Sequence, residues 1–274
     1  AHRQKMVINN DDPWGQRILA EVPLAALTYG IEGDCSVKAT NFELSLAGIS
    51  AGINASGKSF SISSPLIGKF NLYNILAAVS AASILDIPQP VIESGIKNMS
   101  CVPGRLESVA SKSGLHVFVD YAHTDDALRR VLQNLTALKK KRIITVFGCG
   151  GNRDRGKRPL MGEAAVSYSD LTIVTSDNPR LEDPLEIIRE IETGIDRQKI
   201  QKADSINPAA AGGVQSYTVI PDREKAIEAA IGAASPGDIV LIAGKGHEDY
   251  QIIGATKIPF DDRKIAAHAL QVKG

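Results

Sequence analysis

The feature of this sequence that most constrains its fold is a regular alternation of short apolar runs and helical segments after residue 102. Five of these runs are rich in β-branched residues and bounded by turns: HVFVDY, RIITVFG, LTIVTS, SYTVI and DIVLIAG. Runs that are apolar almost throughout indicate strands buried on both faces. Such strands, alternating with helices, predict an α/β domain with a doubly wound, mainly parallel sheet.

Helices are predicted between and after these strands, over DDALRRVLQNLTAL, KRPLMGEAAVSYS, PLEIIREIETGI, DREKAIEAAIGAA and DRKIAAHALQV. In sheets of this kind, ligands bind beyond the carboxyl ends of the strands. Four predicted strand ends are dense in glycine and polar residues, namely DYAH, GCGGNRDRGKR, SDNPR and GKGHEDYQ. We therefore expect these four loops to form one site.

Residues 1–102 have a different organisation, so the 274 residues divide into a domain over 1–102 and another over 103–274. MVINNDD predicts a short strand that ends in an Asn/Asp turn. The Ser/Gly-rich stretch from NFELSL to SSPLIG predicts small antiparallel strands and hairpins. NLYNILAAVSAASILDIP and PQPVIESGIKNM each predict a helix.

Composition limits the classes of partner. Lys+Arg and Asp+Glu total 31 each, and 43% hydrophobic with 23% charged residues is typical of a soluble globular protein. A general nucleic-acid or membrane-surface binder carries a basic excess, so we expect neither partner. Cys35, Cys101 and Cys149 are widely spaced, which favours reduced thiols in a cytoplasmic protein and no metal site in this chain.

The glycine-rich loop GCGGNRDRGKR follows a predicted strand and precedes a predicted helix. Glycines let backbone approach a ligand, and a helix N-terminus favours anions. The loop does not fit the dinucleotide fingerprint, because Arg153 stands where the third glycine belongs, and it lacks the Gly-Lys-Ser/Thr of a P-loop. The alternative is a glycine turn with solvated charges.

Two other strand ends carry candidate ligand-binding groups. DNPR places Asn178, Pro179 and Arg180 after a strand, although an Asx turn before the next helix explains them equally well. In GKGHED, Gly244 would bring backbone close to a ligand while Glu248 meets a cation. The alternative for this motif is a glycine-rich turn with a surface histidine.

Taken together, DYAHTDDAL, FGCGGNRDRGKRPLMG, DNPR and GKGHEDYQ closely resemble the Mur ligases of peptidoglycan synthesis, and within them the branch that adds the third residue of the stem peptide. GKFNLYNILAA, VPGRLE and INNDDP resemble segments of the family's central domain. The resemblance covers essentially the whole chain in order. It implies that 1–102 are the remainder of the central ATP-binding domain. It also implies that 103–274 form the Rossmann-like C-terminal domain, which binds the incoming amino acid and part of the nucleotide.

The resemblance also implies roles for individual residues. Nucleotide binding is implied for Asn71, Asn74, Arg105, Asp120, His123 and Lys157. Among these, Asp120 is expected at the ribose and Asn74 at the adenine, while catalysis is implied for Arg105, His123 and Lys157. Binding of the amino-acid substrate is implied for Arg153, Asp177, Asn178, Pro179, Arg180, Gly244 and Glu248.

The implied reaction uses ATP and Mg²⁺ to phosphorylate a carboxyl group of UDP-MurNAc-L-Ala-D-Glu, and the amine of meso-diaminopimelate then attacks the acyl phosphate. Arg180 favours diaminopimelate over lysine, because a planar guanidinium matches the additional carboxylate. At full length we expect a monomeric cytoplasmic enzyme. A lysine-adding ligase and a non-catalytic nucleotide or amino-acid binding module remain as alternatives.

Some features of the family are not found in this chain. We expect the P-loop, the UDP-sugar-binding domain and the carbamylated lysine that supports magnesium to lie outside it, so the chain alone should be inactive and should bind ATP weakly. Asp125 stands where the family usually has proline, at a helix N-terminus that an acid favours. Residues 198–215 predict a flexible surface loop.

Overall fold

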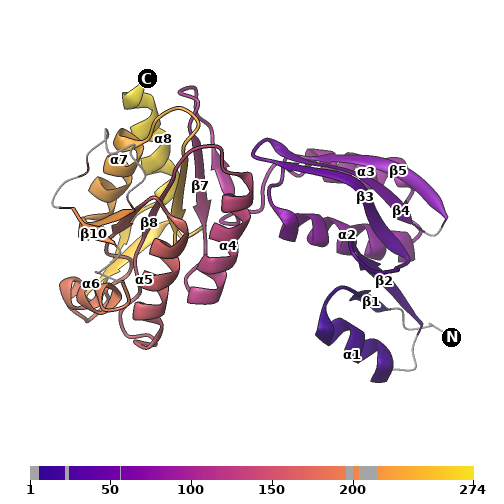
Figure 1. Ribbon diagram of the computed structural model, residues 1–274, viewed down its shortest axis with the longest axis horizontal. Coiled ribbons are helices and arrows are strands. Elements are labelled where there is room, and N and C mark those ends of the chain that lie inside the picture. Colours follow the sequence, from indigo (N-terminus) through magenta and orange to yellow (C-terminus); the bar gives the residue numbers. More distant parts are fainter. Residues whose placement is uncertain (1–5, 22–24, 56, 196–199, 204–205, 207–214) are drawn as a thin grey trace. The chain divides into compact units, whose positions relative to one another are not determined.

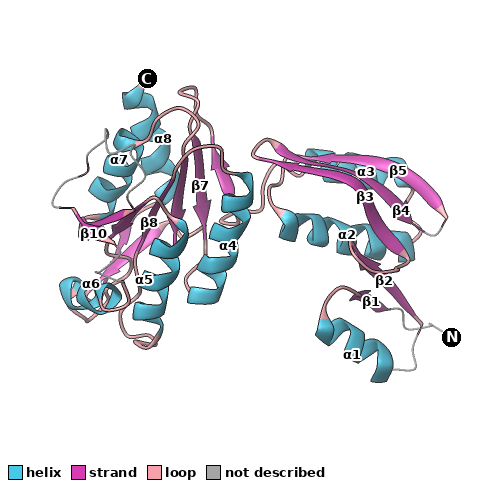
Figure 2. Ribbon diagram, in the orientation of Figure 1, coloured by secondary structure: helices cyan, strands magenta, loops and turns pink. Residues whose placement is uncertain are grey.

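The structure is a computed structural model that describes residues 6–21, 25–55, 57–195, 200–203, 206 and 215–274. The chain divides into two compact units, Ala1–Cys101 and Val102–Gly274. Figure 1 labels their elements along the sequence, and Figure 2 distinguishes helices from strands. Each unit has its own sheet and its own helices.

The second unit contains a seven-stranded sheet of order β10-β11-β9-β8-β12-β7-β6. All neighbouring strands are parallel except β6, which is antiparallel to β7. The strands of this unit are β6 (Glu107–Val109), β7 (His116–Asp120), β8 (Ile143–Phe147), β9 (Leu171–Val174), β10 (Gln201–Lys202), β11 (Ser216–Val219), β12 (Ile239–Ala243), β13 (Tyr250–Ile253) and β14 (Thr256–Pro259). The last two form a separate antiparallel hairpin.

The helices of this unit are α4 (Asp125–Leu138), α5 (Lys157–Tyr168), α6 (Pro184–Glu192), α7 (Arg223–Ala233) and α8 (Asp262–Lys273). The doubly wound, mainly parallel sheet predicted after residue 102 is therefore confirmed, with all five predicted strands and all five predicted helices in place. Strands β6, β10, β13 and β14 were not predicted. Most of the predicted loop over 198–215 lies outside the described residues, and β10 falls within that range.

The central strands of this sheet are buried along their whole length, which explains their nearly continuous apolar sequences. Alternate residues of β7, β8, β9 and β12 pack with α7 and α8 in one hydrophobic cluster. The buried residues of α4, α5 and α6, among them Leu132, Met161 and Ile191, lie outside that cluster and cover the opposite face (Figure 1). Helices on both faces leave the strand ends as the accessible edge of the sheet.

The first unit contains a five-stranded sheet of order β1-β2-β3-β4-β5, in which β1, β2 and β3 are parallel and β3, β4 and β5 antiparallel. Its elements are β1 (Met6–Asn9), α1 (Pro13–Glu21), β2 (Ala26–Gly30), β3 (Val37–Ser45), β4 (Gly48–Ala55), β5 (Lys58–Ser64), α2 (Lys69–Ile84) and α3 (Gln89–Asn98). The predicted strand, hairpins and two helices are confirmed, while α1 and β2 were not predicted.

The core of the first unit lies between its sheet and helices α2 and α3, where Val37, Ile53, Leu72 and Val79 are fully buried. Helix α1 has no buried residue, and its Trp14 side chain is 69% exposed. Helix α1 was not predicted, since it has no core face and Pro13 and Gly15 in its first turn are typical of turns.

Two further observations limit what this fold can be. The letters of a P-loop, G-x-x-x-x-G-K-S, occur at residues 52–59, but residues 52–55 belong to β4 and residues 58–59 begin β5, so a strand and not a helix follows the glycine. The backbone cradle of a P-loop therefore does not form there.

Among the helices that the structure describes, none is long and apolar enough to cross a membrane.

Candidate functional site

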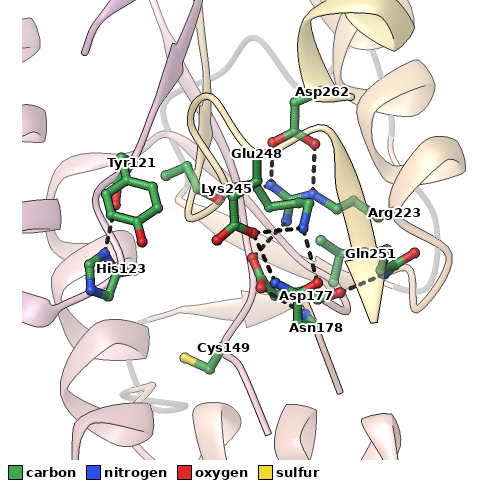
Figure 3. Close-up of polar contacts among 12 residues, drawn as sticks. Tyr121, His123, Cys149, Asp177, Asn178, Arg223, Lys245, Glu248, Gln251 and Asp262 are labelled. Carbon is green, nitrogen blue, oxygen red and sulfur yellow. Dashed lines mark hydrogen bonds and ion pairs between the residues drawn. The ribbon is translucent and has the colours of Figure 1, made fainter. Parts of the chain in front are cut away.

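The four polar loops of the second unit all leave the carboxyl ends of parallel strands. They follow β7, β8, β9 and β12, which are consecutive neighbours in the sheet in the order β9-β8-β12-β7. This is the arrangement expected from the sequence, and it brings the loops to one edge (Figure 3). The candidate site can therefore be described loop by loop, starting from β7.

Asp120 is the last residue of β7, and its side chain is only 2% exposed. One carboxylate oxygen accepts the N–H of Leu106 at 2.8 Å, and the other accepts the N–H of Ala122 at 2.8 Å. Burial raises the pKa of Asp120, while these two amides and the Arg105 charge oppose that rise. The carboxylate thus fixes the loops on either side of the strand end, a function that the sequence did not indicate.

Tyr121 lies at the centre of a group of basic side chains. Its ring is 4.6 Å from the His123 ring and 5.4 Å from the His247 ring, and the Arg105 guanidinium lies 5.6 Å above it. His123 is exposed, and one of its ring nitrogens, Nδ1, lies 2.9 Å from the Tyr121 carbonyl. An aromatic platform bordered by cations suits a flat or anionic ligand.

Lys157, the first residue of α5, extends this basic group. Its ammonium donates a hydrogen bond of 2.7 Å to the His123 carbonyl. Helices α4 and α5 both begin at this edge, and their N-terminal N–H groups favour anions. Arg105, His123 and Lys157, three of the residues predicted to act on phosphate, are thus brought together.

Two glycines allow the loops around Tyr121 to approach closely. A Cβ atom at Gly246 would lie 2.6 Å from the Tyr121 Cβ, and one at Gly104 would lie 2.5 Å from the His247 nitrogen. Both glycines have positive φ, at 54° and 70°. No other residue fits these positions without displacing backbone.

The loop after β9 meets the loop after β12 through a group of hydrogen bonds (Figure 3). Asn178 Nδ2 donates to Glu248 Oε2 at 3.0 Å, and Lys245 Nζ donates to Asn178 Oδ1 at 3.1 Å and to Glu248 Oε2 at 3.2 Å. The Ile252 N–H also donates to Asn178 Oδ1, at 2.9 Å. Asn178 and Glu248, predicted from two separate motifs, are therefore direct partners.

Arg180 adopts a left-handed backbone conformation, with φ of 53°. Its Nη1 donates to the Gly151 carbonyl at 2.9 Å and lies 3.4 Å from the Asn178 carbonyl. Its side chain is half-buried and does not pair with Glu182, which instead binds the buried Arg158. The guanidinium thus lies over the glycine loop, and its other N–H groups make no hydrogen bond to the described residues.

Arg158 joins the glycine loop to helix α6. The side chain is fully buried, donates to Glu182 at 2.9 Å and to Glu190 at 2.7 Å, and lies 3.3 Å from the Gly150 carbonyl. Glu182 also accepts the Asn152 N–H. The Arg158 guanidinium and the Asn152 N–H lower the pKa of Glu182 to about 2.

The glycine loop also approaches the DNPR loop directly. A Cβ at Gly151 would lie 1.9 Å from the Pro179 carbonyl oxygen, and one at Gly150 would lie 2.9 Å from Arg180 Nη1 and 3.8 Å from Arg153 Cγ. Arg153 is exposed, and within the part of the chain that the structure describes its side chain makes one local contact, from Nη1 to the Asn152 carbonyl at 3.1 Å. Arg153 and Arg180 therefore flank the same glycine, as two cations facing one loop.

Asp177 and Gly244 approach each other closely at the strand ends. A Cβ at Gly244 would lie 2.9 Å from Asp177 Oδ2, and the Gly244 backbone has φ of 115°. The same carboxylate oxygen is 3.9 Å from Nη1 of Arg223, a fully buried arginine that pairs with Asp262 at 2.7 Å. Gln251 donates to the Asp177 carbonyl at 2.6 Å.

The two remaining predicted residues, Asn71 and Asn74, lie in α2 of the first unit. Asn71 is 2% exposed and donates to the Ile67 carbonyl at 2.9 Å. Its Oδ1 accepts from Asn74 Nδ2 at 3.2 Å, and Asn74 is exposed. The pair is consistent with one asparagine holding the other in place.

Several buried charged residues were missed from the sequence: Arg158, Arg223, Lys245 and Asp262. Lys245 had the clearest signal, because it stands between two glycines at a strand end, three residues before Glu248. No comparable pattern marks Arg158 or Arg223, which lie in the first turns of α5 and α7. Their burial depends on carboxylates from other segments.

The described residues support neither a cysteine nucleophile nor a metal site. Burial raises the pKa of Cys149 to about 12, so this residue is a thiol at neutral pH and not a nucleophile. Among the residues that the structure describes, no group of three His, Cys, Asp or Glu side chains could hold a metal ion. The site is instead a cationic and hydrogen-bonding surface.

Comparison with known proteins agrees with this description. The Mur ligase middle domain matches residues 1–82, and the Mur ligase glutamate ligase domain matches residues 104–246. The UDP-N-acetylmuramoyl-L-alanyl-D-glutamate–2,6-diaminopimelate ligase of Geobacter sulfurreducens is 47% identical over 98% of this chain and 53% of its own length. The ligase of the same name from Geobacillus thermodenitrificans is 42% identical over 97% of this chain and 51% of its own length.

Solved structures give the same result. A diaminopimelate ligase structure with 35% identity superposes with a TM-score of 0.68, covering 98% of this chain and 53% of that chain. A folylpolyglutamate synthase from Thermotoga maritima, at 16% identity and a TM-score of 0.65, has the same fold over 88% of this chain and 51% of its own. The chain spans about half the length of the curated relatives it matches. With one domain model matching more than half of its residues and a second matching most of the first unit, this chain belongs to the Mur ligase family.

Proposed function

We propose that this chain is the part of a diaminopimelate-adding Mur ligase that binds the amino acid and contacts the nucleotide. The full reaction would use ATP and Mg²⁺ to convert the D-Glu carboxyl of UDP-MurNAc-L-Ala-D-Glu into an acyl phosphate. The amine of meso-diaminopimelate would then displace phosphate. Reactions of this kind depend on positioning and charge neutralisation more than on covalent help from the protein.

The proposal rests on one observation: cationic and anionic side chains lie at neighbouring strand ends. Arg153 and Arg180 flank Gly150 and present cations, while Glu248, on the loop after β12, accepts a hydrogen bond from Asn178, two residues before Arg180. A diamino acid needs both, because its far end carries a carboxylate and an ammonium side by side. A guanidinium matches the carboxylate through two charge-assisted bonds, and Glu248 matches the ammonium.

The basic group around Tyr121 supports binding of the nucleotide. Arg105 and Lys157 place positive charge beside His123 and next to two helix N-termini, which suits phosphate oxygens. The Asp120 carboxylate accepts an amide on each oxygen, so we propose that it shapes the ribose site in addition to contacting the ribose. When bound, ATP would supply the phosphoryl group. We assign Mg²⁺ no ligand among the described residues.

The test compares diaminopimelate with lysine in a completed ligase, made by fusing this chain to the part of the Geobacter sulfurreducens relative that it does not cover. Lysine lacks the carboxylate, so it would leave Arg180 unpaired, and sites built for a polar group can reject its absence by about 10⁴-fold. Arg180→Ala should remove most of that preference. Arg155→Ala is the matched control, because Arg155 is exposed and pairs with Glu190.

Equal use of lysine and diaminopimelate by the wild type would assign the chain to a lysine-adding ligase instead. An unchanged preference in Arg180→Ala would show that another residue reads the carboxylate. If the completed ligase bound both substrates and made no amide bond, the non-catalytic binding module would be the correct description.

A further inference from the structure

Lys245 is a buried lysine in the middle of the amino-acid site. Its side chain is 0% exposed, and its ammonium donates to Asn178 Oδ1 at 3.1 Å and Glu248 Oε2 at 3.2 Å. The ammonium also lies 5.5 Å from the centre of the Tyr250 ring. Lysine is rarely buried completely unless its charge is paired. The only carboxylate that Lys245 contacts within the described part of the chain is that of Glu248.

The contacts of Lys245 fix the orientation of the Asn178 amide. Asn178 Oδ1 accepts from Lys245 Nζ and from the Ile252 N–H at 2.9 Å. With two donors directed at this atom, it must be the carbonyl oxygen, so Nδ2 faces Glu248 and donates to it at 3.0 Å. The reverse orientation would place N–H groups against the Lys245 ammonium and the Ile252 amide.

The same contacts determine which atoms remain for a ligand. Glu248 Oε2 accepts from both Lys245 and Asn178, whereas Glu248 Oε1 accepts no hydrogen bond from the described residues. Asn178 Nδ2 uses one of its two N–H groups on Glu248. One carboxylate oxygen and one amide N–H are therefore left, at neighbouring positions, as an acceptor and a donor.

We propose that Lys245 is a positioning residue for the amino-acid substrate, an inference that rests on the function proposed above. Lys245 compensates the charge of Glu248 and holds the Asn178 amide, so that Glu248 Oε1 can accept from the substrate ammonium while Asn178 Nδ2 donates to its carboxylate. Lys245 itself is buried behind these two side chains and acts through them. The Lys245 side chain is about the same size as that of methionine, so an apolar residue could fill the same space if packing were the only requirement.

The test measures steady-state kinetics of the completed ligase with Lys245→Met, which keeps the volume and removes the charge. Loss of the charge-assisted bond from the buried Lys245 ammonium to the Glu248 carboxylate predicts a KM for diaminopimelate about 10- to 100-fold higher. The KM for ATP and kcat should stay within about threefold, because Lys245 contacts neither the Tyr121 group nor Lys157. Lys257→Met is the matched control, since Lys257 is exposed and lies 3.6 Å from the same Tyr250 ring.

A double-mutant cycle separates positioning from simple packing. In a Glu248→Gln background there is no carboxylate charge to compensate, so adding Lys245→Met should change the KM for diaminopimelate by less than about threefold. An equal effect of Lys245→Met in both backgrounds, or an unchanged KM in the single variant, would overturn the inference. A rise in the KM for ATP of the same size would also overturn it, by showing a general loss of structure.

Crystal structures of this chain with and without Lys245→Met give a readout that does not depend on the substrate. The inference requires the Glu248 carboxylate or the Asn178 amide to change orientation in the variant, and an unchanged pair would contradict it. If the proposed function is wrong, the wild-type completed ligase will reject diaminopimelate. The structural change in Lys245→Met would still occur in that case, so the two failures can be told apart.

Discussion

The Lys157 ammonium donates a hydrogen bond of 2.7 Å to the backbone carbonyl of His123. This contact joins the first turn of α5 to the loop that leads from β7 into α4. It holds a positive charge at the meeting point of two helix N-termini, where anions are favoured. In the proposed reaction this is where a transferred phosphate would gain charge.

Replacing Lys157 by methionine should therefore lower kcat strongly and the free energy of unfolding only slightly. Removing one electrostatic contact to a developing charge typically costs about 10²- to 10³-fold in rate, whereas loss of one exposed hydrogen bond costs about 1 kcal/mol of unfolding free energy. Single-turnover kinetics of the completed ligase measure the first effect, and thermal unfolding measures the second. Lys140→Met is the control, since Lys140 is an exposed lysine that precedes β8 at the opposite edge of the sheet. A kcat within threefold of wild type for Lys157→Met would contradict this role.

Arg158 and Arg155 both contact Glu190, but Arg158 is buried and also binds Glu182. Arg158 is 0% exposed and Arg155 is 67% exposed. Arg158→Met should destabilise the second unit by about 3–5 kcal/mol, because Glu182 and Glu190 lose a buried partner. Arg155→Met should have a much smaller effect, because an exposed ion pair contributes little to stability. Hydrogen exchange of α5 and α6 peptides measures both values, and equal losses would show that burial does not set the energy of this network.

Substitutions at Gly246 and Gly254 separate two costs of adding a Cβ atom: the strain of a positive φ and the clash with a neighbouring segment. Both have positive φ, at 54° and 60°, but a Cβ at Gly246 would lie 2.6 Å from Tyr121, whereas one at Gly254 would meet nothing within 4 Å. Gly254→Ala should cost about 1–2 kcal/mol, the penalty of the left-handed conformation. Gly246→Ala should cost more and should also weaken ATP binding by displacing the Tyr121 ring. Thermal midpoints and calorimetric titration with ATP test this, and matching losses in both variants would contradict it.

Asp11 in the first unit predicts a local dependence on pH. Burial alone would raise its pKa, but the N–H groups of Ile31, Gly33 and Glu32 and the Tyr73 hydroxyl lower the pKa to about 2. A carboxyl pKa that is lower in the folded state contributes stability above its unfolded value near 3.8, and that stability is lost as the pH falls toward 2.

An NMR titration of the Asp11 carboxyl carbon should therefore give a midpoint near 2 in this chain. Tyr73→Phe removes one donor and should move the midpoint upward, while the three amide donors keep it below the ordinary value. Tyr29→Phe is the control, because Tyr29 makes no hydrogen bond to Asp11 through its hydroxyl in the described structure. A midpoint near 4 in the unmodified chain would show that the loop at 31–33 does not close on Asp11.

The hydrophobic pattern of the sequence determined most of the second unit. Strands such as β8 and β12 are buried at every residue, and α4 has a clear buried side, so the period of each element is visible in its own residues. The convergence of four loops could also be predicted, because parallel strands direct their carboxyl ends to one edge. Helix α1 could not be predicted in this way, because none of its residues is buried.

The partners of the charged residues were decided only by the tertiary structure. Lys245 finds Asn178 across 67 residues of sequence, and Arg223 finds Asp262 across 39. Local propensity and periodicity describe what each residue does with its near neighbours, whereas the burial of a charge depends on whether an opposite charge arrives from a distant segment. The sequence therefore determined which loops form the site, and the fold decided which side chains hold one another in place within it.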